Sequence, residues 1–250
     1  VVADAIKRRT NEIMTAKVNG TNLGLKNHAS SLEEVKGFFN RLNSNEEIGK
    51  FAEKVFATAE KLGVNIRFVN QTFMRGAAGN ALGDMVEYKT SYFNDTAVSD
   101  QRKASTILHE LIHSCTVYVM HANQSAGDVY YRDKSQNYEK IANMATRLNR
   151  IFMEIKNDPD FKGEYGTTSP MEMVAELANE RFVGKLKQKN LWEKIVDWIC
   201  ELFGFKRGTS AYENAKMCVD FIIDNPEVSE YKAFAAGQRR TARREGYDVF

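Results

Sequence analysis

Two of the four histidines in this chain of 250 residues stand in a pattern that could bind a metal ion. His109, Glu110 and His113 form the motif H-E-x-x-H within the segment STILHELIHS. Residues four apart lie on one face of an α-helix, so both imidazoles could reach the same ion. Glu110 lies beside them, where its carboxylate could accept a proton from a metal-bound water. The alternative is a pair of core histidines that hydrogen-bond to backbone groups.

A catalytic zinc ion, the default metal for imidazole and carboxylate ligands, needs a third protein ligand and an open position for water. A third histidine at the spacing H-E-x-x-H-x-x-G-x-x-H is excluded because that position is Val119. His121 is expected about 80° around the helix from His113, away from the metal-binding face. The best carboxylate donors are Glu172 and Glu176, which are four apart in YGTTSPMEMVAELANERF.

The roles of these two glutamates stay open at the level of the residues. Ser169 followed by Pro170 predicts the start of a helix, and Ser169 with Glu172 has the spacing of a capping box. Glu172 is therefore either the third ligand or a helix cap. Glu176 is either a supporting residue or the direct ligand. A metal bound by one carboxylate, with the other bonded to a ligand histidine, would satisfy both.

Three segments carry a resemblance to a known family: His109-Glu110-x-x-His113, Tyr165-Gly166-x-Thr168 and Glu172-x-x-Ala175-Glu176. They resemble the gluzincin metallopeptidases, and the nearest motifs are those of the lethal-factor type. The resemblance covers about residues 100–205. It implies one Zn²⁺ per chain on His109, His113 and Glu172, with Glu176 as a supporting residue. It also implies Glu110 as the general base and Tyr165 as a donor to the oxyanion.

The function that follows from the resemblance is a zinc-dependent endopeptidase, a hydrolase whose partner is a protein or peptide substrate. The segment Ser169–Phe205 also resembles metallopeptidase-like regions of phage and mobile-element polyvalent proteins. The alternative is therefore a non-catalytic zincin-fold binding or structural module of such a protein, including one associated with nucleic acid. Only the run Arg239, Arg240, Arg243 and Arg244 supports nucleic acid, and a formal net charge of +2 gives no general case for it. The intact Glu110 favours the enzyme.

The order of the predicted strands and helices that must position these residues indicates an α+β fold. Residues 64–69 and 85–93 are rich in β-branched and aromatic side chains, which predicts two strands with a loop at 76–83 between them. Helices are expected at about 1–18, 31–62 with a break at 43–45, 99–120, 137–157, 170–187, 190–203, 209–224 and 229–242. The expected fold is zincin-like: a small mixed sheet and the active-site helix, followed by a mostly helical C-terminal half.

By the same resemblance, the strand at 85–93 would be the edge strand that holds an extended peptide. Its substrate-binding residues would be Met85, Val86, Glu87 and Tyr88. The expected organisation is an N-terminal helical segment or linker at 1–30, the metallopeptidase domain at 31–225 and a helical tail at 226–250.

Composition adds few constraints on location. The sequence has no apolar run near 18 residues, so no membrane span is expected. The apolar face of 191–205 is expected to dock within the molecule rather than on a membrane. Three cysteines imply no disulfide framework. The first residues lack an apolar signal core, and sparse cysteine suits cytoplasm or virion without excluding secretion, so the location stays open. The absence of a start Met suggests a processed chain or a piece of a larger polyprotein.

Overall fold

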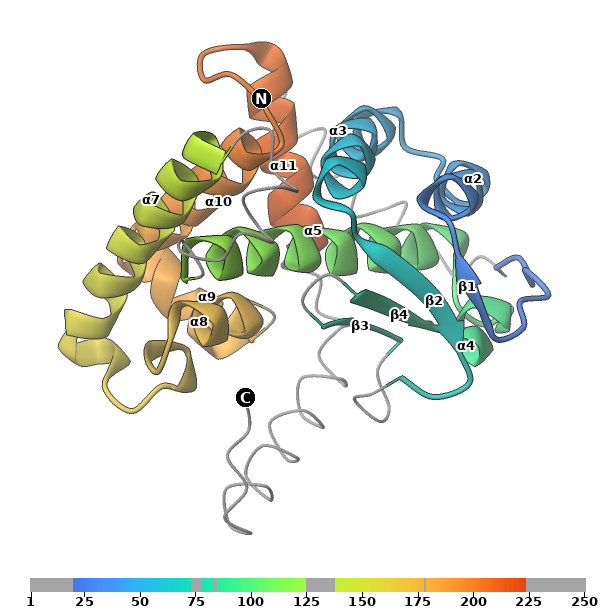
Figure 1. Ribbon diagram of the computed structural model, residues 1–250, viewed down its shortest axis with the longest axis horizontal. Coiled ribbons are helices and arrows are strands. Elements are labelled where there is room, and N and C mark those ends of the chain that lie inside the picture. The colour runs from blue at the N-terminus through green and yellow to red at the C-terminus, as the bar shows by residue number, and fades with distance from the viewer. Residues whose placement is uncertain (1–19, 73–77, 83–84, 125–137, 178, 224–250) are drawn as a thin grey trace, which may run out of the picture.

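The computed structural model describes residues 20–72, 78–82, 85–124, 138–177 and 179–223 (Figure 1). The strands are β1 (His28–Ser30), β2 (Asn65–Val69), β3 (Gly79–Leu82) and β4 (Met85–Lys89). The helices are α2 (Leu32–Leu42), α3 (Glu46–Leu62), α4 (Thr90–Asn94), α5 (Asp100–Gln124), α7 (Tyr138–Asn157), α8 (Pro170–Glu176), α9 (Glu180–Gln188), α10 (Leu191–Leu202) and α11 (Ser210–Ile223). Two short 3-10 helices, η1 (Pro159–Phe161) and η2 (Tyr165–Thr167), lead into α8. The expected helices at 1–18 and 229–242 and the arginine run at 239–244 lie outside the described residues.

The four strands form one mixed sheet in the order β1-β2-β4-β3. β2 and β4 are parallel, whereas β1 and β3 pair with them antiparallel at the two edges. Side chains alternate along β2, and Ile66 and Phe68 are buried on the face that the helices cover. Phe38 of α2 packs edge-to-face on Phe68, with ring centroids 5.7 Å apart. The predicted α+β class with a small sheet and mostly helical remainder is confirmed.

The helices predicted around residues 31–62 are confirmed as α2 and α3. The Ser31 side chain accepts a hydrogen bond from the Glu34 backbone N–H at 3.1 Å and so caps α2. Asn45 caps α3 in the same way, which explains the break between the two helices. Both helices pack against α5, which runs along the middle of the molecule in Figure 1.

The expectation that the strand at 85–93 forms the edge of the sheet is wrong. β4 ends at Lys89, and α4 follows it directly. β4 lies between β2 and β3, so its backbone is paired on both sides. The edge strand is β3, which falls inside the segment expected to be a loop. Its sequence GNAL has low strand propensity, and pairing with β4 overrides that preference.

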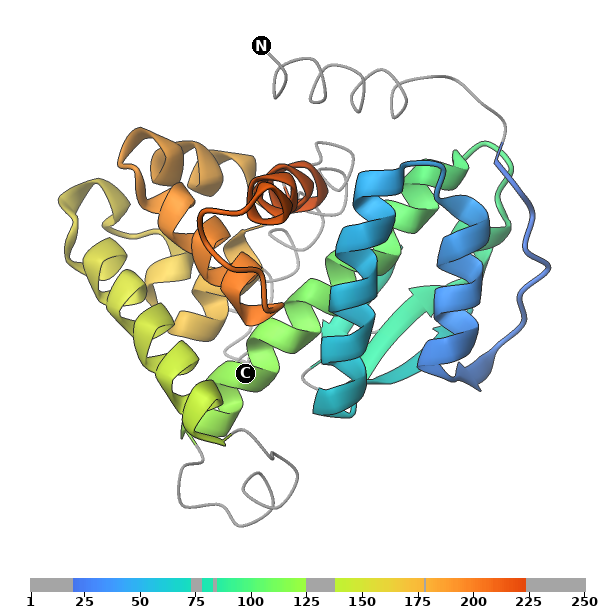
Figure 2. The same ribbon diagram turned by 90° about the horizontal axis from the view of Figure 1, so that it is seen from above.

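The helical half, α7 to α11, packs beside α5 on the side away from the sheet (Figure 2). The broad apolar face of α10 is buried, as predicted, and the indole N–H of Trp198 donates to the Met144 carbonyl at 2.7 Å. The single helix expected at 170–187 is two helices, because Asn179 caps α9 with its side chain. Among the helices of the described ranges, none combines the length and apolar character needed to cross a membrane.

Candidate metal centre

α5 places His109 and His113 on one face, as the spacing predicts. His109 is 3% exposed, and His113 is partly buried one turn later. The two Nε2 atoms are 3.0 Å apart, and the ring centroids are separated by 4.5 Å. The two imidazoles therefore converge on one point.

The orientation of His109 is set by a backbone group from the far end of the chain. Its Nδ1 lies 3.2 Å from the carbonyl oxygen of Ile222 in the last turn of α11. A carbonyl oxygen only accepts, so Nδ1 carries the proton and Nε2 keeps its lone pair. The last carbonyls of a helix have no partner within it, which leaves this one available. Ligand histidines in metalloproteins are commonly oriented by such a bond.

The pair fits a metal ion as two of its ligands. Zinc binds imidazole nitrogen at about 2.0–2.1 Å, so two tetrahedral ligands are roughly 3.3 Å apart. The observed 3.0 Å between the Nε2 atoms needs only a small widening. Burial, together with the neighbouring His109, holds the pKa of His113 well below its usual value. His113 is therefore neutral near pH 7, which is the form that binds metals.

Glu110 lies beside the pair, against the edge strand β3. It is 6% exposed, and burial raises the pKa of its carboxyl to about 8. The backbone N–H of Ala81 donates to this carboxyl, which favours the ionised form and opposes the shift. Gly79 approaches its side chain closely, since a β carbon there would lie 2.6 Å from Glu110 Cγ. An acid with this pKa can hold or release a proton near neutral pH.

The two candidate carboxylates lie on α8, which packs against α5. Ser169 accepts a hydrogen bond from the Glu172 N–H at 3.1 Å, so the predicted cap is confirmed. Glu172 is partly exposed, whereas Glu176 is 8% exposed and accepts a 2.6 Å bond from the Asn179 side chain. Tyr165 is partly buried in η2, which packs on α8.

The structure brings His109 and His113 together, with Glu110 next to His109 in the helix, but leaves a third ligand apart from the pair. Within the described ranges, no three His, Cys, Asp or Glu side chains lie close enough to hold one ion. His121 belongs to α5, and its side chain lies outside the described part. The choice between Glu172 and Glu176 therefore stays a prediction.

The substrate-binding prediction for β4 loses its basis in this arrangement. Val86, Glu87 and Tyr88 are buried, and β4 has no free edge because β2 and β3 pair with it. Sequence reasoning missed the residues that do contact the site through the backbone, Gly79, Ala81 and Ile222. The glycine in GNAL was the one available signal, because a backbone N–H or carbonyl leaves no mark in the sequence.

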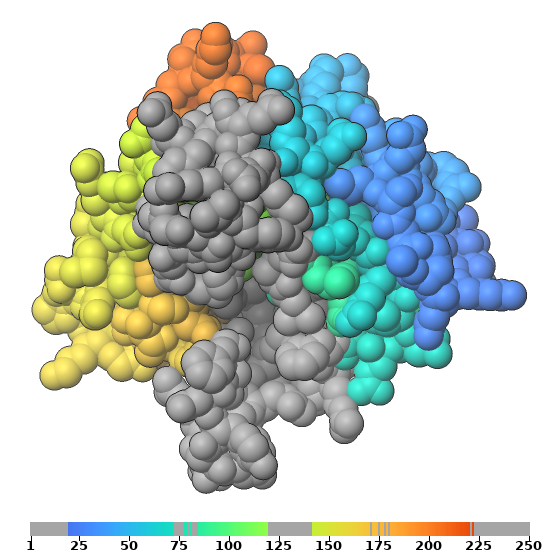
Figure 3. Space-filling model, viewed as in Figure 1, coloured from blue at the N-terminus to red at the C-terminus, as the bar shows by residue number. Residues whose placement is uncertain are grey.

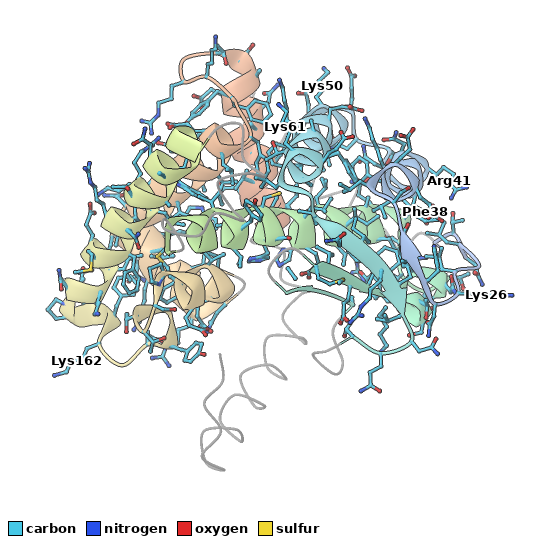
Figure 4. All side chains as sticks on the ribbon, viewed as in Figure 1. Lys26, Phe38, Arg41, Lys50, Lys61 and Lys162 are labelled. Carbon is cyan, nitrogen blue, oxygen red and sulfur yellow. The ribbon has the colours of Figure 1, made fainter. Side chains whose placement is uncertain are left out.

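The prediction about nucleic acid as a partner concerns the charged side chains on the surface. Figure 4 labels five exposed cations: Lys50 and Lys61 on α3, Arg41 on α2, Lys26 before β1 and Lys162 after η1. In the space-filling view, the sheet-side and helical halves lie on opposite sides of the face shown (Figure 3).

Comparison with protein-family models, with curated proteins and with solved structures finds no match to this chain.

Proposed function

We propose that this protein is a zinc-dependent endopeptidase with a zincin-like fold. One observation carries the proposal: two imidazole Nε2 atoms converge to 3.0 Å beside a buried glutamate. The bond from His109 to the Ile222 carbonyl supports it, because it turns the metal-binding nitrogen of His109 towards His113. A purely structural histidine pair would gain nothing from a buried glutamate next to it in the helix.

Each residue has a defined role in this proposal. His109 and His113 would hold the ion, and Glu172 or Glu176 of α8 would complete its protein ligands. A bound zinc ion supplies a Lewis acid that lowers the pKa of water towards neutrality. Glu110 would accept a proton and pass it to the leaving amine of the substrate. Tyr165 would donate a hydrogen bond to the oxyanion.

The substrate would be an extended peptide on β3 rather than on β4. β3 is the edge of the sheet on the side of Glu110, and an edge strand presents main-chain groups that its own sheet does not pair, of which the Ala81 N–H bonds to Glu110. A peptide that adds a strand here would bind through its backbone next to the proposed base.

Metal analysis separates the two ligand candidates. The wild type should contain one zinc per chain, and either Glu172→Ala or Glu176→Ala should lose most of it. Glu33→Ala, which changes an exposed glutamate of α2, should retain the zinc of the wild type. A wild type that binds no zinc, or two alanine variants that both retain it, would contradict the proposed ligand set.

Peptide cleavage then tests the chemistry. Glu110→Gln should abolish cleavage and keep the zinc. The side-chain amide of glutamine is neutral and cannot act as a general base near neutral pH. The enzyme proposal fails if zinc-loaded wild type cleaves nothing in a broad peptide library. That outcome would favour the alternative, a zincin-fold module that binds without catalysis.

A further inference from the structure

The backbone of β3 has one row of N–H groups that points away from the sheet. The Lys89 N–H donates to the Ala78 carbonyl at 2.8 Å, which makes Ala78 and Lys89 a hydrogen-bonded pair. Such pairs alternate along an antiparallel ladder, so the register Ala81–Val86 is a non-hydrogen-bonded pair. The N–H of Ala81 therefore faces outward from the sheet, and it donates to the carboxyl of Glu110.

Gly79 provides the space that this contact needs. A β carbon on Gly79 would lie 2.6 Å from Glu110 Cγ and 3.2 Å from both Cδ and Oε1. All three of its nearest neighbours are atoms of Glu110. The backbone of Gly79 is not in the left-handed region, so an alanine is disfavoured there by this side chain and not by its own conformation.

The strand and the helix are fixed to each other close to this contact. The hydroxyl of Tyr88, which is fully buried in β4, donates to the Ile107 carbonyl of α5 at 2.9 Å. Ile107 precedes Glu110 by three residues, nearly one helical turn. β3 pairs with β4 in turn. The donor on β3 and the carboxyl on α5 therefore belong to one tightly packed unit.

We propose that Gly79 and the Ala81 N–H are positioning elements that hold the Glu110 carboxyl in one orientation for proton transfer. The inference rests on the proposed function for its catalytic meaning, and the contact itself can be tested without it. A carboxylate that accepts one backbone N–H keeps acceptor sites free for a reacting proton. A displacement of about 1 Å at a catalytic group can cost roughly a hundredfold in rate.

The first test is a double-mutant cycle on thermal unfolding. Gly79→Ala should lower Tm by about 5 °C, because the new methyl group overpacks against Glu110. In the Glu110→Ala background the same change should leave Tm nearly unchanged. Gly37→Ala in α2, whose β carbon would meet nothing within 4 Å, should have the same effect in both backgrounds. Equal effects of Gly79→Ala in the two backgrounds would overturn the close contact.

The second test is hydrogen exchange of single amides by NMR on the metal-free protein. The outward Ala81 amide should be protected in the wild type and should exchange at least about tenfold faster in Glu110→Ala. The Leu82 amide, which faces β4, should keep its protection in both proteins. An Ala81 amide that exchanges at the same rate in both proteins would overturn the proposed bond.

Kinetics connects the contact to catalysis. Gly79→Ala should lower kcat about a hundredfold while its zinc content and KM stay those of the wild type. A Gly79→Ala variant with wild-type kcat, or one that loses its zinc, would overturn the positioning role. If the exchange and unfolding results hold and the wild type cleaves no peptide, the proposed function fails and the contact stands.

Discussion

Replacing Gly20 by alanine should destabilise the protein far more than an ordinary Gly→Ala change. Gly20 and Thr21 cross the start of α5, the helix that carries the histidines. The Gly20 N–H donates to the Thr96 carbonyl at 2.7 Å. Thr21 donates to the Asp100 carboxylate from its N–H at 2.5 Å and from its hydroxyl at 2.8 Å. The Thr21 carbonyl accepts a 2.5 Å bond from Lys103.

A methyl group at Gly20 is incompatible with these bonds. Its β carbon would lie 1.7 Å from the carbonyl oxygen of Val98, so the two backbones would have to separate by more than about 1 Å. Both partners are main chain, and no side-chain rotamer relieves the clash. Losing even two bonds to charged groups costs about 1.5–3 kcal/mol each, so we expect a loss of about 3 kcal/mol or more. Lys103, which is fully buried, would also lose its acceptor.

Urea unfolding followed by circular dichroism measures this loss. The midpoint should fall while the slope m stays constant, because the unfolded surface is the same. Gly184→Ala in α9 is the matched control, since its β carbon would meet nothing within 4 Å. It should be neutral or slightly stabilising, as alanine is the better helix former. A Gly20→Ala variant within about 1 kcal/mol of the wild type would refute this account of the segment.

Three further changes test other parts of the structure. Burial lowers the pKa of Lys103 from its ordinary 10.5, so the unfolded state binds its proton more tightly and stability should rise as pH rises towards 10.5. Lys103→Met should weaken this rise in unfolding midpoints, and parallel pH profiles for the two proteins would contradict it. Asn179→Ala should cost about 1–2 kcal/mol in urea unfolding, because its side chain caps α9 and bonds to Glu176; a neutral change would count against the cap. Tyr88→Phe should cost about 1 kcal/mol through the lost bond to Ile107, and an unchanged midpoint would argue against that bond.

Local signals in the sequence predicted the helices well. The side chains of Ser31 and Ser169 each accept a hydrogen bond from the backbone N–H three residues later. A helix starts directly after each serine. Such caps involve residues three apart, so a short window contains all the information. The spacing of His109 and His113 is equally local, and their convergence in α5 follows from helical geometry alone.

Long-range pairing decided the features that sequence reasoning missed. β1 contains only His28–Ser30 and forms because β2 lies beside it, although 1–30 was expected to be an N-terminal helical segment or linker. β3 forms by pairing with β4 despite its glycine and asparagine. This pairing moves β4 to the interior of the sheet and makes β3 the edge. Strand order depends on contacts between segments, and the propensity of each segment does not contain it.

The candidate site also combines features that local sequence predicts with features that depend on long-range contacts. Of the side chains that the motif names, His109 and Glu110 are each oriented by a backbone atom that the motif does not name. The Ile222 carbonyl, 113 residues from His109, sets which ring nitrogen keeps its lone pair. The Ala81 N–H, on a strand that propensity does not predict, holds the carboxyl of Glu110. Every residue type except proline supplies both kinds of group, so only the fold determines whether the motif is arranged for chemistry.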